Sequence, residues 1–174
     1  MTALPAGSLF PKMDVAMVGG GTLTLGAPRG GHDWQLMVVY RGLHCPLCKT
    51  YLAVLQDIEA ECAALGVDVV AVSGDPEEKA RGFVHDVGLT LAVGYDLGIA
   101  QMRELGLYIS DPRSPQETDR PFPEPGLFVV NDQGRIQIVD VSNAPFARPD
   151  LRTIASGIKF IRANDYPVRG THGG

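Results

Sequence analysis

Residues Trp34 to Tyr40, WQLMVVY, form an apolar run bounded by glycines on both sides, which is the pattern of a central β-strand buried on both faces. Val67 to Ser73 predicts a second strand of this kind. Between the two runs, apolar residues recur with the 3.6-residue helical period from Leu47 to Leu65, and Gly66 stands in the position of a C-terminal cap. A strand, a helix and a strand in this order predict an α/β fold with parallel strands.

The other segments are assigned from similar patterns. In chain order they are a hairpin of Asp14 to Val18 and Thr22 to Leu25, a helix with Asp75 as cap and Pro76 in its first turn that ends near Gly88, a strand from Leu89 to Val93, a short helix from Gly98 to Leu105, a surface loop from Ser110 to Pro125, a hairpin of Leu127 to Val130 and Arg135 to Val141, a helix from Pro149 to Ala163, and an extended tail. We therefore expect one domain over residues 1–174, with parallel strands in the first half and an antiparallel edge in the second.

Composition excludes several classes of protein. The 174 residues carry a net charge of −5, which gives no basic surface for nucleic acid. No run of 18 apolar residues occurs, and the first residues lack a secretory pattern, so we expect a soluble cytoplasmic protein with no membrane partner. Three cysteines are an odd number, whereas a secreted chain of this size more often shows a larger, even set.

Cys45 and Cys48 lie where the first strand passes into the helix. Cys45 occupies the expected cap position, where free backbone N–H groups and the helix dipole favour a thiolate. Three residues are about one helical turn, which brings the two sulfurs close enough to form a disulfide. In a reducing compartment such a pair is more often catalytic or metal-binding than a structural crosslink.

Other roles for these residues carry less weight. A structural zinc needs about four ligands, and the chain has one cysteine pair with scattered histidines, so we expect no metal. The third cysteine, Cys62, lies on the apolar stripe of the helix and is expected to be a core residue. His44, next to Cys45, is either a cation that favours the thiolate or a solvated loop residue. Arg41 and Lys49 have the same two alternatives, since both are ordinary polar residues at the rim of a helix start.

The run YRGLHCPLC, Tyr40 to Cys48, together with EPGLFVVNDQGRI, Glu124 to Ile136, resembles the peroxiredoxin-like branch of the thioredoxin superfamily, the alkyl hydroperoxide reductase/thiol-specific antioxidant family. The resemblance spans most of the chain. It implies a thioredoxin-like fold with a central mixed sheet flanked by helices and an N-terminal hairpin, a redox-active disulfide, and no cofactor. Within that superfamily a cis-proline faces the cysteine pair, and Pro125 matches its position; a cis bond is uncommon enough to be a deliberate feature.

The sequence departs from this family in two respects and from thioredoxins in a third. The family's peroxidatic cysteine follows a Thr or Ser by three residues, and alignment on Cys48 places Cys45 there instead. Pro125 falls where the family has a peroxide-binding arginine, and Arg120 is merely close to it in sequence. The buried acid that thioredoxins carry in the central strand is also missing from Gln35 to Tyr40.

Three hypotheses follow. In the first, the protein is a thiol-disulfide oxidoreductase in which Cys45, expected to be the more exposed thiol, attacks a protein disulfide, Cys48 resolves the mixed disulfide, and Pro125 and His44 contact the partner. In the second, Cys48 attacks a hydroperoxide and Cys45 resolves the sulfenic acid. In the third, the pair is a noncatalytic redox sensor or belongs to a binding module. The first two require a thiol reductant, and the tail YPVRG is a candidate contact in a homodimer.

Overall fold

The computed structural model describes residues 4–172 and contains a seven-stranded mixed sheet with the strand order β2-β1-β5-β4-β3-β8-β9. The strands are β1 (Met13–Met17), β2 (Thr22–Leu25), β3 (Trp34–Val39), β4 (Val67–Val72), β5 (Ala92–Tyr95), β8 (Gly126–Val130) and β9 (Ile136–Val141), and a separate pair is formed by β6 (Ile109–Ser110) and β7 (Phe122–Pro123). The helices are α1 (Pro46–Ala64), α2 (Glu77–Val87), α3 (Ile99–Glu104) and α4 (Leu151–Asn164). No helix in the described part of the chain is long and apolar enough to cross a membrane.

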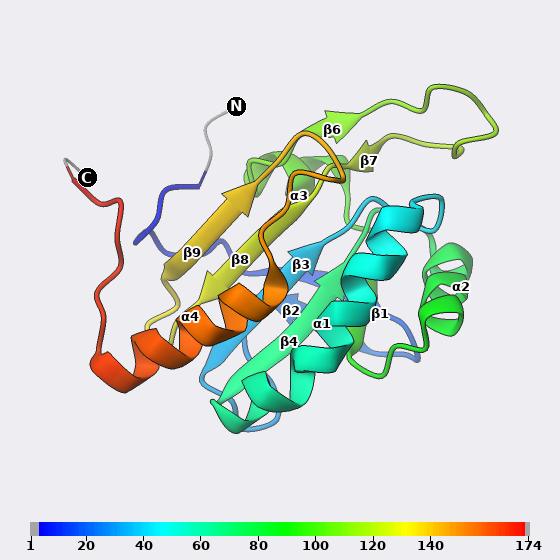
Figure 1. Cartoon of the computed structure of the whole chain (residues 1–174). Coiled ribbons are helices and arrows are strands. Elements are labelled where there is room, and N and C mark those ends of the chain that lie inside the picture. The colour runs from blue at the N-terminus through cyan, green and yellow to red at the C-terminus, as the bar shows by residue number, and fades with distance from the viewer. Residues whose placement is uncertain (1–3, 173–174) are drawn as a thin grey trace.

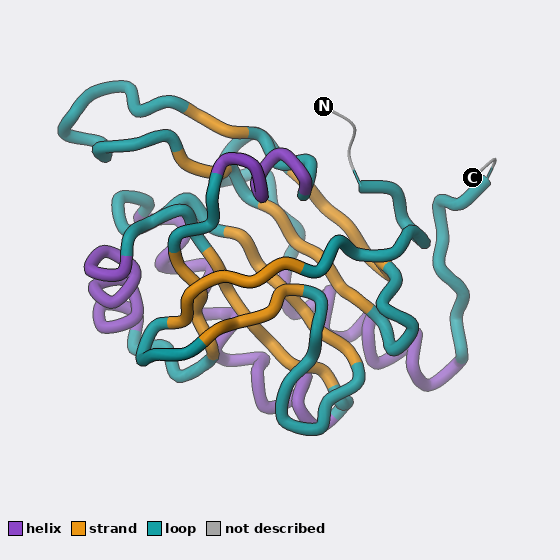
Figure 2. Tube along the Cα trace, turned by 180° about the vertical axis from the view of Figure 1, so that it is seen from behind, coloured by secondary structure: helices purple, strands orange, loops and turns teal. Residues whose placement is uncertain are grey.

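The sheet separates two apolar layers. Helices α1, α2 and α4 cover one face (Figure 1), where Leu36, Val38 and Val69 pack beneath them. Seen from behind (Figure 2), the other face carries α3 and the N-terminal segment. Met37 and Val70 belong to the apolar cluster on that side, together with Met102 of α3. Successive residues of β3 and β4 therefore enter different layers, which explains why both strands are apolar throughout.

The predicted strand and helix types are largely confirmed. Strands β3, β4 and β5 are parallel neighbours, and β8 and β9 form the expected antiparallel edge. The N-terminal hairpin also joins the sheet, because β1 pairs antiparallel with β5, so antiparallel strands flank the parallel centre on both sides. The strand predicted from Leu89 begins only at Ala92, since the Leu89 N–H donates to Val84 at the end of α2 and the N–H groups of Thr90 and Leu91 donate to the Gln56 amide oxygen.

Two local predictions are wrong. Asp75 does not cap α2; Pro76 is the cap residue, with no side-chain bond, and the buried Asp75 carboxylate accepts a hydrogen bond of 2.7 Å from the Leu43 N–H. The segment from Ser110 to Pro125 is not only a surface loop, because its last four residues are buried and β7 pairs with β6. Both differences concern contacts around the start of α1.

Candidate functional site

Cys45 is the N-cap residue of α1, as the sequence predicts. Its backbone is extended, with φ −105° and ψ 101°, and its Sγ accepts a hydrogen bond of 3.2 Å from the Cys48 N–H. Pro46 occupies the first turn, where its missing N–H costs nothing. A bond of 3.1 Å from the Cys45 N–H to the Gly42 carbonyl closes the turn that follows β3. The sulfur of Cys45 therefore takes the place of the oxygen in an ordinary capping residue.

The expected difference in exposure between the two thiols is wrong. Cys45 is 1% exposed and Cys48 is 0% exposed, and both belong to the core cluster beneath α1. The first turn of α1 packs directly on the sheet, so the cap residue is buried with the residue one turn later. Accessibility in this state does not decide which sulfur reacts first, and a reactant requires local opening.

The two thiols differ in their pKa values, which are shifted in opposite directions. The pKa of Cys45 is lowered from 9.0 to about 6, first by a hydrogen bond from the Cys48 thiol, and also by the Cys48 N–H and by the Arg41 guanidinium, while burial opposes the shift. The pKa of Cys48 is raised, because its thiol proton is held by Cys45 and because burial disfavours a second anion. In the reduced pair the negative charge thus lies on Cys45 and the proton on Cys48.

Arg148 contacts the second sulfur, and it was not identified from the sequence. Its Nη1 donates to Cys48 Sγ at 3.5 Å, and its guanidinium carbon lies 4.3 Å from the ring centroid of Tyr51. The Tyr51 hydroxyl donates to the Pro149 carbonyl at 2.7 Å, which holds the segment before α4 against α1. Arg148 lies 100 residues from Cys48, so only the packing of this segment on α1 brings them together.

Arg41 lies four residues before Cys45, and side chains of the 110–125 segment hold its guanidinium. Its Nε forms an ion pair with Glu124 Oε2 at 3.1 Å, and its Nη2 is 3.9 Å from Glu117 Oε1. The guanidinium also stands 4.7 Å from the ring centroid of Phe122. The other oxygen of Glu124 accepts from Ser110 Oγ at 2.7 Å. The segment predicted as a loop thus fixes a charge that favours the Cys45 thiolate.

His44 does not supply that charge. Its ring meets Phe122 edge-on, with 4.6 Å between centroids, and both ring nitrogens are buried without a hydrogen-bond partner among the described residues. Burial first, and then Arg41, lower the pKa of His44, so its imidazole is neutral at neutral pH. Contact between His44 and a partner stays a prediction.

Pro125 is not in the expected cis form, since residues 4–172 contain no cis peptide bond. The Glu124 N–H donates to Tyr108 at 2.8 Å and the Pro125 carbonyl accepts from the Ser142 N–H at 3.0 Å, so extended pairing continues through the proline into β8. Pro125 is buried, and its carbonyl is already bonded. Its role in holding a partner stays a prediction.

The side chains of the remaining candidates have other surroundings. Arg120 pairs with Asp119 and lines a hollow beside Gly74, and Lys49 pairs with Asp86 at 2.7 Å. Cys62 is buried in the core and has its pKa raised to about 11 by burial. Among residues 4–172 no group of three or more His, Cys, Asp or Glu side chains could hold a metal ion.

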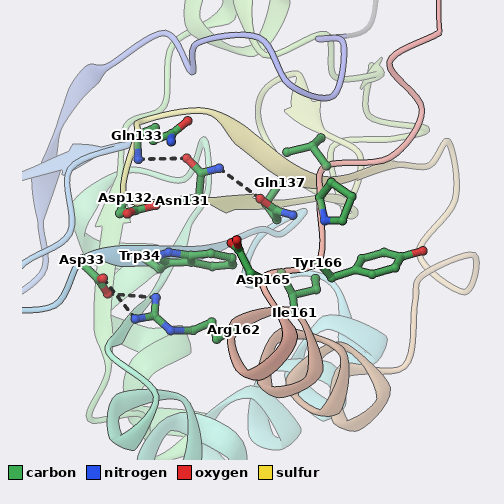
Figure 3. Close-up of a pocket in the computed structure, with 12 residues that line it drawn as sticks. Asp33, Trp34, Asn131, Asp132, Gln133, Gln137, Ile161, Arg162, Asp165 and Tyr166 are labelled. Atoms are coloured by element: carbon green, nitrogen blue, oxygen red, sulfur yellow. Dashed lines mark hydrogen bonds and ion pairs between the residues drawn. The ribbon is translucent and has the colours of Figure 1, made fainter.

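One hollow on the surface adjoins the cysteine pair, and a second lies at the opposite end of β3. One, of about 440 Å³, lies between α1 and the segment before α4, and is lined by Leu47, Tyr51, Phe146 and Arg148, so it adjoins the Cys48 contact. The other, of about 320 Å³, lies at the opposite end of β3 (Figure 3), where Arg162 pairs with Asp33 and Asn131 donates to Gln137. It is polar but is lined by no cysteine, so we assign the chemistry to the cysteine end of the sheet.

Comparison with known proteins agrees with this geometry. The model of the AhpC/TSA family matches residues 6–139. A peroxiredoxin-like protein from Aquifex aeolicus has a similar solved structure, with 18% sequence identity and a TM-score of 0.76 over 92% of this chain and 90% of that chain. A mutant of peroxiredoxin 6 from Arenicola marina is similar with 18% identity and a TM-score of 0.78, over 94% of this chain and 76% of that chain. AhpC from Mycobacterium tuberculosis is similar with 16% identity and a TM-score of 0.76, over 95% of this chain and 97% of that chain. No curated protein gives a significant match. The chain has the thioredoxin-like fold of these structures, and it belongs to the AhpC/TSA family of thiol-dependent oxidoreductases.

Proposed function

We propose that the protein is a thiol-disulfide oxidoreductase in which Cys45 attacks a protein disulfide and Cys48 resolves the product. The observation that carries this proposal is the polarisation of the pair, with the Cys45 sulfur accepting the N–H at the start of α1 and Cys48 holding the proton. A thiolate is the attacking species in such exchange, and the sulfur that binds protons less tightly at neutral pH is the first nucleophile.

The proposed reaction has two steps. The Cys45 thiolate forms an S–S bond to one substrate sulfur, and the second substrate sulfur leaves as a thiolate that takes up a proton. Cys48 then loses its proton and attacks Cys45 Sγ, which breaks the mixed disulfide and releases the first substrate sulfur as a thiol. The substrate gains two electrons, and Cys45 and Cys48 end as a disulfide, which a thiol reductant reopens. We place this cycle in the cytoplasm, where such reductants keep thiols reduced.

Replacing each cysteine in turn tests the order of the two steps. With 5,5′-dithiobis(2-nitrobenzoate), the Cys48→Ser variant should keep a stable mixed disulfide at Cys45, and the Cys45→Ser variant should react far more slowly. A Cys62→Ala variant serves as the control, because Cys62 is buried away from the pair. Unchanged reactivity of Cys45→Ser would remove Cys45 from the first step.

A second candidate reaction is supported by the Arg148 contact and by membership of the family. Deprotonated Cys48 attacks a hydroperoxide oxygen, the O–O bond breaks, the alkoxide leaves as an alcohol, and Cys48 becomes a sulfenic acid. Cys45 then attacks the Cys48 sulfur and releases water, giving the same disulfide. In this reaction the Arg148 guanidinium stabilises the Cys48 thiolate. A sulfenate-specific reagent should label Cys48 in the Cys45→Ser variant after peroxide treatment, and an unlabelled protein would exclude the mechanism. A disulfide that forms without turnover of any disulfide or peroxide would favour a noncatalytic sensor.

A homodimer is a separate part of the proposal. Tyr166 in the tail and Phe160 on α4 form an edge-on pair with centroids 5.6 Å apart, and both rings are partly exposed. This aromatic surface is our candidate contact for a second copy. A Tyr166→Ser, Phe160→Ser variant should elute from a sizing column as a monomer where the unmodified chain elutes as a dimer, and identical elution would remove this surface from the proposal.

A further inference from the structure

The hollow of about 320 Å³ at the far end of β3, here called the polar hollow, contains an amide donor without a partner. Asn131 Oδ1 accepts hydrogen bonds of 3.0 Å from the backbone N–H groups of Gln133 and Arg135. Its Nδ2 is therefore fixed as a donor, and it donates to Gln137 Oε1 at 3.0 Å.

This chain of hydrogen bonds also fixes the orientation of the Gln137 amide. Its Nε2 carries two N–H groups, which donate to no other residue between positions 4 and 172. Gln137 is 9% exposed and lines the polar hollow together with Asn131, Trp34 and Asp165 (Figure 3). Because a buried donor without a partner is unfavourable, the amide indicates a ligand that brings an acceptor into the hollow.

The walls of the polar hollow attract a cation. Asp132 and Asp165 line it and have no ion-pair partner in the part of the chain that the structure describes. The third carboxylate, Asp33, is neutralised by Arg162 at 3.0 Å. Asp165 is the C-cap residue of α4, where the helix dipole adds partial negative charge. A ligand bound here therefore carries a positive group as well as an acceptor.

A second hollow, here called the apolar hollow, adjoins the first and has a volume of about 300 Å³. The two share Gln137, Ile161, Tyr166 and Pro167, so the Gln137 amide lies at their junction. Ile138 and Val139 line the apolar hollow, and so does Arg169, which has no ion pair within residues 4–172. The joined hollows thus offer carboxylates on one side and a guanidinium on the other, with apolar surface beside the amide.

We propose that the joined hollows bind a free α-amino acid with an apolar side chain. The ammonium group of the ligand pairs with Asp165 and Asp132. Its carboxylate accepts from Gln137 Nε2 and pairs with Arg169, and its side chain packs on Ile161. The polar hollow alone has the volume of about ten waters, which is close to the size of leucine.

The site is independent of the redox pair, because it lies at the opposite end of β3 from Cys45. It is also compatible with the aromatic surface assigned to a second copy. The Tyr166 ring is directed away from Trp34 (Figure 3), so its contact with Phe160 lies outside the polar hollow.

Trp34 reports occupancy directly, since it is the only tryptophan in the sequence and lines the polar hollow. The full chain is titrated with L-leucine at pH 7 while tryptophan emission is recorded, and equilibrium dialysis with labelled leucine is run in parallel. Saturable binding with a Kd of about 1 mM or below is expected for a ligand of this size. Absence of binding in both measurements would overturn the proposal.

Three compounds that each lack one group of leucine test how the ligand is held. Isoamylamine lacks the carboxylate, isocaproate lacks the ammonium group, and glycine lacks the apolar side chain. Each should bind at least about fivefold more weakly than leucine, because one of the three contacts is lost. Equal binding of isoamylamine and leucine would mean that the acidic wall attracts any amine. Equal binding of leucine and any one of the three compounds would overturn the proposed site.

Two pairs of variants test the charged contacts. Asp165→Asn removes a carboxylate and keeps the left-handed cap conformation, at φ 48°, which asparagine adopts readily. Asp96→Asn is its matched control, because Asp96 also has a positive φ, of 55°, and lies beyond the end of β5. Arg169→Gln removes the guanidinium, with Arg103→Gln on the exposed side of α3 as its control.

Asp165→Asn and Arg169→Gln should each weaken leucine binding by about three- to fivefold, and each control by less than about twofold, since all four charges are exposed. Equal effects within a pair would overturn the contact that the pair tests. Alkylation of Cys45 should be unchanged in all four variants, so a failure of this site and a failure of the redox function give different results.

Discussion

Removing the Cys48 thiol should raise the pKa of Cys45, because that thiol is the largest cause of the lowered value. Cys48→Ala deletes the S–H donor but keeps the backbone N–H that bonds to Cys45 Sγ. A hydrogen bond to a charged group contributes about 1.5–3 kcal/mol, and one pKa unit corresponds to about 1.4 kcal/mol. The pKa of Cys45 should therefore rise from about 6 by about one to two units.

The ratio of alkylation rates at two pH values measures the pKa of Cys45, and the exposure of the sulfur does not affect this ratio. For a pKa of about 6 the rate with iodoacetamide falls about tenfold between pH 7 and pH 5, whereas for a pKa near 7.5 it falls about seventyfold. Burial slows alkylation at both pH values alike, so the ratio reports the pKa alone. Quenched samples with mass mapping of Cys45 give the ratio, and Cys62→Ala should reproduce the unmodified profile. A tenfold ratio in Cys48→Ala would refute the argument that the two sulfurs share a proton.

Three further predictions concern the loop that carries Cys45. Gly42 has φ +136°, and a Cβ there would lie 2.7 Å from an Asp75 carboxylate oxygen. Gly42→Ala should therefore lose about 3 kcal/mol of unfolding free energy in a denaturant titration. The control Gly20→Ala, at φ +107° with no neighbour within 4 Å of the added Cβ, should lose about 1 kcal/mol. Equal losses would mean that the carboxylate contact is unimportant. His44→Leu should leave the alkylation profile of Cys45 unchanged, because the imidazole is neutral, and a profile shifted by a full pH unit would instead show that His44 carries charge. The pKa of Cys45 is lower in the folded than in the unfolded chain, so its contribution to stability is complete above the unfolded pKa and is lost as pH falls through about 6. Relative to Cys45→Ser, the unmodified protein should gain about 1.4 kcal/mol of unfolding free energy between pH 5 and pH 7 in urea titrations, and a constant difference would contradict the low pKa.

The order of strands and helices was predictable because its signals are local. The apolar run of β3, the helical period of α1 and the glycine after it each depend on neighbouring residues alone. The position of Cys45 at the cap follows from the same local pattern, since Pro46 and the apolar period fix where the helix begins.

The contacts that set the charge of the site were not predictable from local patterns. Arg148 reaches Cys48 across 100 residues, and Glu124 reaches Arg41 from a segment that composition identified only as a loop. Asp75 has the sequence context of a helix cap, yet its carboxylate bonds to Leu43 because Gly42 leaves room for it. The contacts of each of these side chains depend on how separate elements pack against one another. The periodicity of a single sequence does not indicate that packing.

The burial of Cys45 also escaped prediction. Helix geometry places a cap residue at the end of a helix, but whether that end faces solvent depends on what packs around it. Here the start of α1 lies in the core cluster, and the segment before α4 supplies Arg148 against it. The difference between Cys45 and Cys48 is therefore one of charge, and exposure contributes nothing to it.

The central claim is that Cys45 and Cys48 form one redox pair in which Cys45 reacts first with a disulfide. The most direct measurement treats reduced Cys48→Ser and Cys45→Ser proteins with one equivalent of a small disulfide at pH 7 and follows adduct formation by mass spectrometry. The account predicts rapid labelling of Cys45 in the first variant and slow labelling of Cys48 in the second. Faster labelling of Cys48 would contradict it.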